Sequence, residues 1–354
     1  MSIPFDPKEL EIVSMKPSFF GAEIPVYNYP VTVKEAVIAT YQRKPIWQLT
    51  GTESGFFTPK VYPDNVARAF VFDANHMKPE EGGGKDLFGL EWEYIPAAGG
   101  SMVRPGKPFL SDANEWYEKI VWPDINSWDW EKEAKVNEGY LKPDTFNICS
   151  MLNGWFERLI SLMDFEGAIM ALIDEDQKNA VKDFYDKLTD LYIQICDKMM
   201  VYFPSIDGFN CHDDWGSQKE TFFSPDVVEE MIVPYMRRLT DHLHSKGMIC
   251  DFHSCGQILK QVPNMIKAGW DSWSGQPMND TERAYELYGD KIIIGVLVKD
   301  LNPEAPEEEL RAAARVYADK FCRPDKPSIL NGGYALPNAF REELYKQSRI
   351  NYSK

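Results

Sequence analysis

The amino-acid sequence predicts an α/β fold, a TIM (β/α)8 barrel. In the C-terminal half, short apolar runs alternate with helical segments, as they do where helices connect the strands of a parallel sheet. Polar clusters follow the expected strands, and barrels of this type place their active sites at the carboxyl ends of their strands. The length of 354 residues suits one such barrel with insertions.

The C-terminal half provides the clearest strand and helix pairs. The run SIDGFNC is an expected strand, and the helix after it has Ser224 as its cap, Pro225 in its first turn and Gly247 at its end. MICDF is the next strand, and its helix ends at Gly269. Further strands are expected at WDSWSGQ, KIIIGVLV and KPSIL, separated by a helix from Asp280 and by the helix EAPEEELRAAARVYADKF.

The N-terminal half is less regular. KPIWQLTG and TFNICSML are predicted strands, and a long helical pattern covers residues 169–203. Residues 56–130 are rich in Trp, Pro and Gly, and we expect loops or a short hairpin over the barrel mouth, because long irregular segments tend to be binding loops. Residues 1–43 are expected to form an N-terminal extension. The whole chain, 1–354, is predicted to be a single TIM-barrel domain.

Charge and composition exclude several classes of partner. A net charge of -17 and an isoelectric point near 4.8 argue against nucleic acid and against an anionic membrane surface, since both require a basic face. The N-terminus lacks the pattern of a signal peptide, and no stretch approaches the ~20 apolar residues that span a bilayer, so a cytoplasmic protein is expected. The six scattered cysteines are expected to be reduced thiols.

The stretch DFHSCGQ contains the first candidate metal ligands. His253 and Cys255 lie two residues apart at the end of an expected strand, so both side chains project from the same face. Neutral imidazole and thiolate are standard zinc ligands, and a catalytic zinc uses three protein ligands and one open position. Candidates for the third ligand are Cys211, His212, Asp213 and Asp214 on the preceding strand, and Cys322, which is placed on the wrong side of its unit.

Two neighbouring carboxylates, Asp213 and Asp214, are candidates for acid catalysis or for completing the metal shell. Because side chains alternate along a strand, only one of the two is expected to face the cavity. The alternative is that they cap the following turn, a common role for Asp. His212 is expected to pack or to support a ligand from behind. His242 and His244, at the end of a helix, are predicted to be structural.

Aromatic and amide side chains near the expected mouth are candidates for the substrate pocket. Phe57, Phe88 and Trp92 can either line such a pocket or fill space. The GGGK segment before Asp86 lacks the GxxxxGK[ST] pattern of a phosphate-binding loop, so no bound nucleotide is expected. The candidates for substrate contact are Asp86, Trp47, Trp215, Gln218 and Gln276.

The order of HDDWGSQ, an SP at the next helix start, HxCG after the next strand and GWDSWSGQ resembles the uroporphyrinogen decarboxylase superfamily. The resemblance runs from about residue 44 to about residue 340 and implies a TIM barrel. The decarboxylases hold the carboxylates of a tetrapyrrole with arginines in a motif similar to PVWxMRQAGRYxPEY. This chain has Gln48, Leu49, Thr50 and Gly51 where those basic residues would be, which argues against decarboxylation of acidic porphyrinogens.

The other branch of that superfamily, the corrinoid-dependent methyltransferases, matches better. His253 and Cys255 match its His-x-Cys zinc pair, and Asp86 to Trp92 matches the D-x-FG-x-x-W of homologues that look like methyltransferases of bacterial demethylation systems. The branch also has a later Cys in a Gly-Cys-Gly turn, where this chain reads NGGY. The resemblance therefore implies zinc held by His253, Cys255 and either Cys211 or a carboxylate.

The function implied is a zinc-dependent methyltransferase. It would move a methyl group from a small-molecule methyl donor, an aromatic methyl ether (O-demethylation), to cobalamin on a separate corrinoid protein. Asp213 or Asp214 would donate a proton to the leaving oxygen. Three alternatives stay open: the reverse transfer from methylcobalamin to a thiol; a metal-free decarboxylase-like lyase; and a metal-free scaffold subunit. The lyase would use Arg68, Arg104 or Lys107 to hold an acidic substrate.

Overall fold

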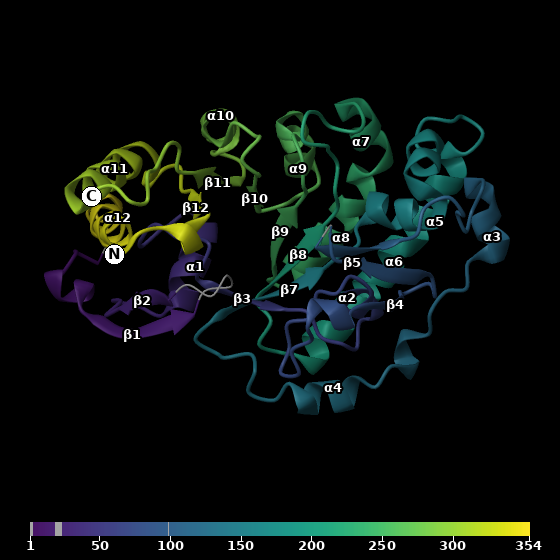
Figure 1. The fold of residues 1–354 in the computed structure, drawn as a ribbon, viewed down its shortest axis with the longest axis horizontal. Coiled ribbons are helices and arrows are strands. Elements are labelled where there is room, and N and C mark those ends of the chain that lie inside the picture. Colours follow the sequence, from purple (N-terminus) through teal and green to yellow (C-terminus); the bar gives the residue numbers. More distant parts are fainter. Residues whose placement is uncertain (1–2, 18–22, 98) are drawn as a thin grey trace. The chain divides into compact units, whose positions relative to one another are not determined.

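The structure is a computed structural model that describes residues 3–17, 23–97 and 99–354. The chain forms two compact units. Unit 1 comprises Met1–Gly55, Pro143–Phe146 and Asp271–Lys354, and unit 2 comprises Phe56–Lys142 and Asn147–Trp270. Both units contain parallel strands joined by helices (Figure 1), which confirms the predicted α/β class. The expectation of a single domain stays a prediction.

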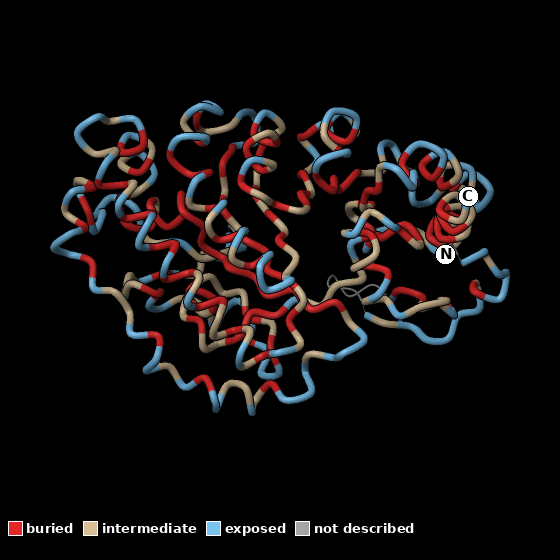
Figure 2. Tube along the Cα trace, turned by 180° about the vertical axis from the view of Figure 1, so that it is seen from behind, coloured by how far each residue is buried: buried red, intermediate tan, exposed pale blue. Residues whose placement is uncertain are grey.

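Unit 2 is organised around three adjacent parallel strands, β7 (Phe146–Met151), β8 (Gly208–His212) and β9 (Ile249–His253). These are the strands predicted at TFNICSML, SIDGFNC and MICDF. β7 is buried along its whole length, and Figure 2 shows the buried chain in the interior of the unit. The register pairs His212 with His253, so that β8 and β9 end side by side.

The helical pattern predicted over residues 169–203 is in fact two helices, α5 (Trp155–Ala171) and α6 (Lys178–Tyr202). The prediction missed most of α5. The chain leaves the helix at residues 172–177, where the Asp174 carboxylate accepts hydrogen bonds from the backbone of Asp176 and the side chain of Gln177. Such a local bond from Asp competes with the helical ladder and favours a turn.

The helix predicted between Ser224 and Gly247 also divides, into α7 (Pro225–Met231) and α8 (Val233–Ser245). Ser224 caps α7 as expected, because its Oγ accepts the N–H of Val227 at 3.4 Å. The break falls at Ile232, whose φ of -122° is not helical. Pro234 follows two residues later and has no N–H for the helical ladder, so a new helix starts there. The same unit contains η5 (Leu259–Gln261) and α9 (Val262–Lys267).

The segment predicted as loops or a hairpin, residues 56–130, contains a three-stranded antiparallel sheet. Its strands are β4 (Gly83–Lys85), β5 (Glu91–Ile95) and β6 (Gly100–Val103). The expectation of irregular structure was therefore only partly right. β3 (Ser54–Phe57) leads into this segment. The remaining elements up to residue 136 are α2 (Pro63–Ala67), η2 (Pro79–Glu81), η3 (Ala113–Glu115), α3 (Trp116–Lys119), η4 (Ile125–Ser127) and α4 (Trp130–Val136).

Unit 1 has its own parallel strands, β10 (Ser272–Ser274), β11 (Ile293–Leu297) and β12 (Ile329–Asn331), in the order predicted. The strand expected at KPIWQLTG was wrong. Within it only a single bridge forms, between Leu49 and Ile329. Pro45 has no N–H to donate, and Gly51 turns the chain with a φ of 74°, so an extended ladder cannot continue through this stretch.

The remaining elements of unit 1 include the start of the chain. The side chain of Glu9 pairs with Arg349 at 2.7 Å and thereby ties the first short helix to the last long one. The other elements are η1 (Pro7–Leu10), β1 (Ile12–Pro17), β2 (Glu23–Tyr27), α1 (Val33–Tyr41), α10 (Thr281–Tyr288), α11 (Glu307–Phe321), η6 (Gly333–Ala335) and α12 (Asn338–Tyr352).

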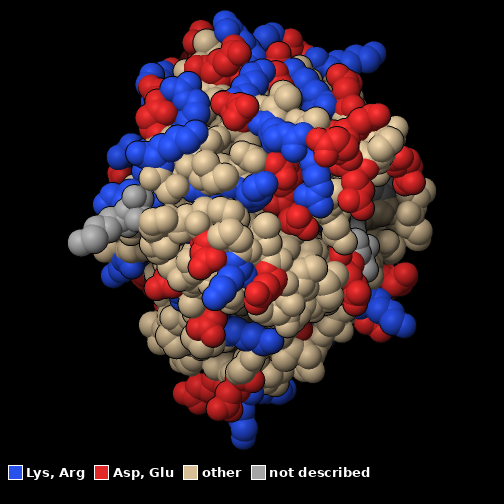
Figure 3. Space-filling model, turned by 90° about the vertical axis from the view of Figure 1, so that its left-hand side faces the viewer, with Lys and Arg blue, Asp and Glu red and all other residues tan. Residues whose placement is uncertain are grey.

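The outer surface of unit 1 carries charges of both signs. Arg311 on α11 pairs with Glu342 on α12 at 2.9 Å, and acidic and basic side chains are interspersed on the face that Figure 3 shows. Among the residues that the structure describes, no helix combines the length and the apolar character needed to cross a membrane.

Candidate metal centre

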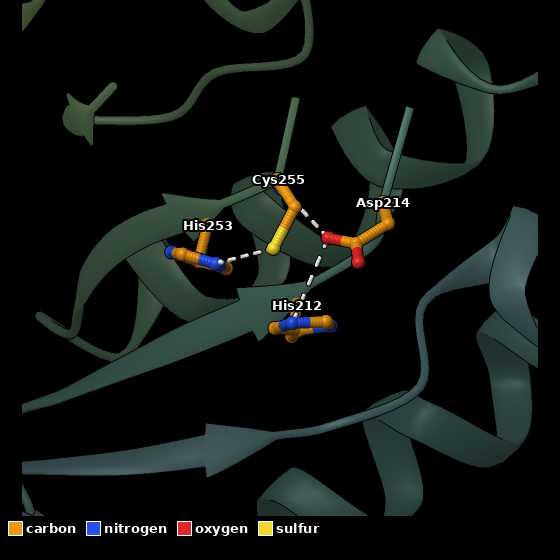
Figure 4. A group of neighbouring side chains, drawn as sticks. All are labelled: His212, Asp214, His253 and Cys255. Atoms are coloured by element: carbon orange, nitrogen blue, oxygen red, sulfur yellow. Dashed lines mark hydrogen bonds and ion pairs between the residues drawn. The ribbon is translucent and has the colours of Figure 1, made fainter. Parts of the chain in front are cut away.

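Four side chains with metal-binding atoms converge at the ends of β8 and β9: His212, Asp214, His253 and Cys255 (Figure 4). One ligand atom from each lies within 4.8 Å of all the others, and all four residues are partly accessible. Two come from the end of β8 and two from the end of β9, so the group consists of an His-x-Asp pair beside an His-x-Cys pair. We call these four residues the metal cluster.

The backbone after the two strands fixes where these side chains point. His212 and His253 are paired in register, and Asp214 and Cys255 each follow two residues later on the same face. The two loops are joined by hydrogen bonds from Asp213 N to His253 O at 3.0 Å and from Gln257 N to Ser217 O at 2.7 Å.

A glycine allows these loops to approach so closely. At Gly256, which has a φ of 91°, a Cβ atom would lie 2.2 Å from the carbonyl oxygen of Gly216. Only glycine accepts both that conformation and that contact. The sequence HSCG therefore supplies two candidate ligands together with the residue that lets their loop lie against its neighbour.

The distances within the metal cluster suit a single metal ion. Cys255 Sγ lies 3.5 Å from His253 Nε2, and Asp214 Oδ1 lies 3.6 Å from His212 Nε2. Ligands bound tetrahedrally to one zinc at its usual bond lengths are separated by about 3.3–3.8 Å. Asp214 Oδ1 also accepts the backbone N–H of Cys255 at 2.7 Å, which holds the carboxylate in place (Figure 4).

His212 is supported from behind by charged residues. Its Nδ1 lies 2.6 Å from Oε2 of Glu157, and Oε1 of Glu157 lies 2.9 Å from Nη1 of Arg68. Burial disfavours the imidazolium, but the charge of Glu157 and hydrogen bonds to Cys255 and Glu157 raise the pKa of His212 to about 10. Burial likewise disfavours the Glu157 carboxylate, but Arg68 and His212 outweigh it and lower the pKa of Glu157 to about 2.

The two residues predicted from HSC have opposite electrostatic surroundings. Burial, together with the positive charge on His212, lowers the pKa of His253 to about 3, so this ring is held in the neutral form that binds metals. The pKa of the Cys255 thiol is raised, mainly by burial and then by the charge of Asp214. A metal cation would favour the thiolate.

Asp213 was predicted alongside Asp214 as a catalytic acid, and the structure directs it elsewhere. Its side chain is fully buried, and it accepts hydrogen bonds from the backbone N–H groups of Phe156 at 3.2 Å and Glu157 at 2.8 Å and from Trp215 Nε1 at 3.0 Å. It therefore caps α5. Burial, with the charge of Glu157, raises the pKa of Asp213 to about 7.

Cys211, predicted as a possible third ligand, is not part of the metal cluster. It precedes His212 on β8, so its side chain projects from the opposite face of the strand. It is 2% exposed, and burial raises the pKa of its thiol well above the usual value. The position that Cys211 was expected to fill is occupied by His212 and Asp214.

Asp86, predicted to contact substrate, belongs to a separate group of buried charges. One of its oxygens accepts hydrogen bonds from Arg158 Nη1 at 2.8 Å and Trp92 Nε1 at 3.0 Å, and the other accepts the backbone N–H groups of Phe88 and Leu90. Burial and the nearby Asp64 raise the pKa of Asp86, although Arg158 opposes them. The D-x-FG-x-x-W motif is thus a hydrogen-bonded turn closed by its own first and last residues.

The other predicted pocket residues are dispersed. Trp215 is fully buried, where it packs against Phe252 with ring centroids 4.7 Å apart. Gln218 is exposed on the loop after β8. Trp47 and Gln276 belong to unit 1: Trp47 is stacked on Tyr29 with centroids 4.7 Å apart, and Gln276 is partly exposed after β10.

The residues that the sequence analysis undervalued are His212, Glu157 and Arg68. His212 was named among the candidates for the third ligand, but a packing or supporting role was favoured, although His212 and Asp214 have the same two-residue spacing as His253 and Cys255. That repeated spacing on neighbouring strands was the available signal. Nothing in the sequence near Glu157 or Arg68 indicates their contacts with His212 Nδ1, at 2.6 Å for Oε2 of Glu157 and 3.3 Å for Nη2 of Arg68, because both residues lie far from His212 along the chain.

Comparisons with known proteins agree with the α/β arrangement of strands and helices described above. The family model "Uroporphyrinogen decarboxylase (URO-D)" matches residues 142–346, more than half of the chain. A solved structure described as a methyltransferase from Methanosarcina mazei superposes with a TM-score of 0.59 at 14% sequence identity, covering 90% of this chain and 98% of that one. The chain therefore shares its fold with that methyltransferase.

The other comparisons add no argument. The hyperthermostable endo-1,4-β-D-mannanase of Thermotoga petrophila RKU-1 superposes with a TM-score of only 0.31 at 11% identity, over 68% of this chain and 75% of that one. Among curated proteins, none matches the sequence.

Proposed function

The chain belongs to the uroporphyrinogen decarboxylase family, and we propose that within it the protein is a zinc-dependent methyltransferase. The observation that supports this most directly is the metal cluster. Metal binding would displace the proton of His212, after which two neutral imidazoles, one thiolate and one carboxylate together carry two negative charges, which offset those of a zinc ion. The fold shared with a methyltransferase is consistent with the proposal.

All four residues of the metal cluster would contribute ligand atoms to the metal. His253 and Cys255 would hold the metal, with His212 and Asp214 completing the donor set. Bound zinc supplies a Lewis acid that polarises an oxygen or lowers the pKa of a thiol. Of the two carboxylates first considered for completing the metal shell or donating a proton, only Asp214 faces this group, so we assign it the first role; as an ionised ligand it has no proton to give.

The methyl donor and acceptor come from the resemblance to corrinoid-dependent methyltransferases. We propose an aromatic methyl ether as the donor, and cobalamin on a separate corrinoid protein as the acceptor. The reverse reaction, to a thiol acceptor, uses the same donor set and stays the alternative. We also propose that the strands of this chain close into the eight-stranded barrel that the resemblance implies.

The ion pairing of Arg68 argues against the alternative of a metal-free lyase. Such an enzyme would need a cation to hold an acidic substrate, and Arg68 was one of the candidates. In the structure its guanidinium is bound by Glu157 at 2.9 Å and by Asn153 at 3.3 Å, and it lies over the ring of Trp92. A cation already neutralised by a buried carboxylate is poorly suited to binding a substrate carboxylate.

Elemental analysis of the purified protein tests the proposal. We expect one equivalent of zinc in the parent and its loss in His253→Ala. His242→Ala is the matched control, because His242 pairs with Asp197 at 2.8 Å outside the metal cluster and should keep its zinc. A parent that takes up no zinc when supplied with it would contradict the proposal. With zinc confirmed, methoxy-aromatics and thiols would be compared as methyl donor and acceptor in the presence of a corrinoid protein.

A further inference from the structure

Glu157 is a buried carboxylate beside the metal cluster that the proposed function leaves without a role. It is 9% exposed, and each of its oxygens has a different partner. Oε2 lies 2.6 Å from Nδ1 of His212, and Oε1 lies 2.9 Å from Nη1 of Arg68. Nη2 of Arg68 also lies 3.3 Å from this Nδ1, but the contact with Glu157 is much shorter, and a carboxylate can only accept, so Nδ1 carries the hydrogen that Glu157 accepts.

The backbone holds Glu157 in this position. It lies in the first turn of α5, and the Asp213 carboxylate accepts the backbone N–H groups of Phe156 and Glu157. Just before the helix, Gly154 donates its N–H to the carbonyl oxygen of His212 at 2.7 Å. A Cβ at Gly154 would lie 2.4 Å from the Cβ of Asp213, so the start of α5 is packed directly against the end of β8.

Arg68 prevents the carboxylate from turning away. Its Nη1 binds both Glu157 Oε1 and the side-chain oxygen of Asn153, and its guanidinium carbon lies 5.5 Å from the centroid of the Trp92 ring. With one oxygen held by Arg68, the other stays directed at His212. Such a support orients the ring before any ligand binds, and metal-bound histidines commonly have a carboxylate in this place.

We propose that Glu157 is a positioning residue that orients His212 as a metal ligand. By accepting the Nδ1–H it leaves Nε2, the nitrogen that lies 3.6 Å from Asp214 Oδ1, to face the metal cluster. The inference rests on the proposed function, because it assigns which nitrogen of His212 binds the metal. The inference also gives Asp213 an indirect role, because Asp213 binds the backbone of the helical turn that contains Glu157.

A double-mutant cycle on zinc affinity tests the inference. The affinities of the parent, Glu157→Gln, His212→Ala and the double variant are measured by competition with a chelator. We expect Glu157→Gln to weaken binding by about 10- to 100-fold in the parent. It should have little further effect in His212→Ala, because Glu157 acts through that ring. Equal weakening in both backgrounds, or none in the parent, would overturn the inference.

Two further measurements exclude a purely structural role. Glu133→Gln is the matched control, because Glu133 is partly buried and accepts the backbone N–H of Lys60 at 3.0 Å, away from the metal cluster. It should leave zinc affinity unchanged. Glu157→Ala should weaken binding more than Glu157→Gln, which keeps an acceptor oxygen. If both Glu157 variants lower only the urea midpoint, the residue supports folding and does not position His212.

Nitrogen-15 NMR of the histidine rings in zinc-free protein separates failure of this inference from failure of the proposed function. The Nδ1–H of His212 should exchange slowly with solvent in the parent and faster in Glu157→Gln. Similar exchange in both proteins would overturn the inference even if zinc binds. A parent that binds no zinc but shows this difference would contradict the proposed function and leave the contact between Glu157 and His212 supported.

Discussion

Unit 2 contains two clusters of charged and polar side chains that differ in one decisive respect. In the buried ion group, Asp64, Asp86 and Arg158 are completely enclosed, and the guanidinium binds both carboxylates. In the metal cluster, the four side chains are partly accessible and their donor atoms point toward one another. Sequence motifs drew attention to both regions.

The difference is one of charge balance and access. Asp86 is satisfied by Arg158, by Trp92 and by the backbone, so its ligand capacity is used within the protein. The metal cluster brings together carboxylate, thiol and imidazole groups, which together match a soft divalent cation. A motif around a charged residue therefore indicates a binding site only if the polar atoms of that residue are not already paired within the protein.

The largest expected effect is on stability, in the buried ion group. Arg158→Ala would leave two buried carboxylates without their cation and should lower the free energy of unfolding by about 3–5 kcal/mol. Urea denaturation measures this change. Zinc affinity, measured in the fraction that remains folded, should stay close to that of the parent. A strong loss of zinc affinity there would mean that the two clusters are not independent.

The next largest effect compares two cysteines. Cys255→Ser should weaken zinc binding at least 100-fold, equivalent to about 2.7 kcal/mol, because a thiolate donor is lost. Cys211→Ala should leave zinc affinity unchanged, since its thiol is buried outside the metal cluster. Chelator competition measures both. Zinc loss in Cys211→Ala with retention in Cys255→Ser would reverse the assignment made from the structure.

A smaller effect compares the neighbouring carboxylates. Asp213→Ala removes the carboxylate that caps α5 and should cost about 1 kcal/mol of stability, since replacing a capping residue by Ala costs on that order. Asp214→Asn should instead reduce zinc affinity while leaving the urea midpoint nearly unchanged. Measuring both quantities on both variants shows whether adjacent residues have separate roles. Matching profiles for the two variants would count against that separation.

The smallest effect is a pH dependence of stability in the buried ion group. Two carboxylates share one guanidinium there, and burial raises the pKa of Asp86 above 3.8. Between the usual pKa and the raised one, the folded protein binds more protons than the unfolded chain, so this contribution to stability is present at low pH and is lost as pH rises through the raised pKa. Urea midpoints measured at increasing pH above 3.8 should show a decrease that Asp86→Asn removes. An unchanged slope in Asp86→Asn would contradict the raised pKa.

Local patterns were enough to predict much of the fold. The strands β7, β8, β9 and β11 correspond to short runs rich in apolar residues, and the Ser224 cap of α7 was predicted from its chemistry. The strand predicted at KPIWQLTG was wrong, because only a single bridge forms there in place of a ladder of hydrogen bonds. Each of the two long helices predicted from periodicity is divided in the structure, near Asp174 and near Pro234, where the helical backbone hydrogen bonds are interrupted. Such interruptions depend on individual hydrogen bonds, which periodicity does not reveal.

For the site, the sequence by itself determined that His253 and Cys255 share a face at a strand end, because that follows from two-residue alternation. It could not say which of Asp213 and Asp214 joins them, since alternation sends the two to opposite faces without saying which is which. The pairing of β8 with β9 decided that, and it made His212 a member of the metal cluster. Tertiary packing alone brings Glu157 and Arg68 into contact with His212. Residues so distant in sequence meet only after the strands have paired and the helices have packed against them.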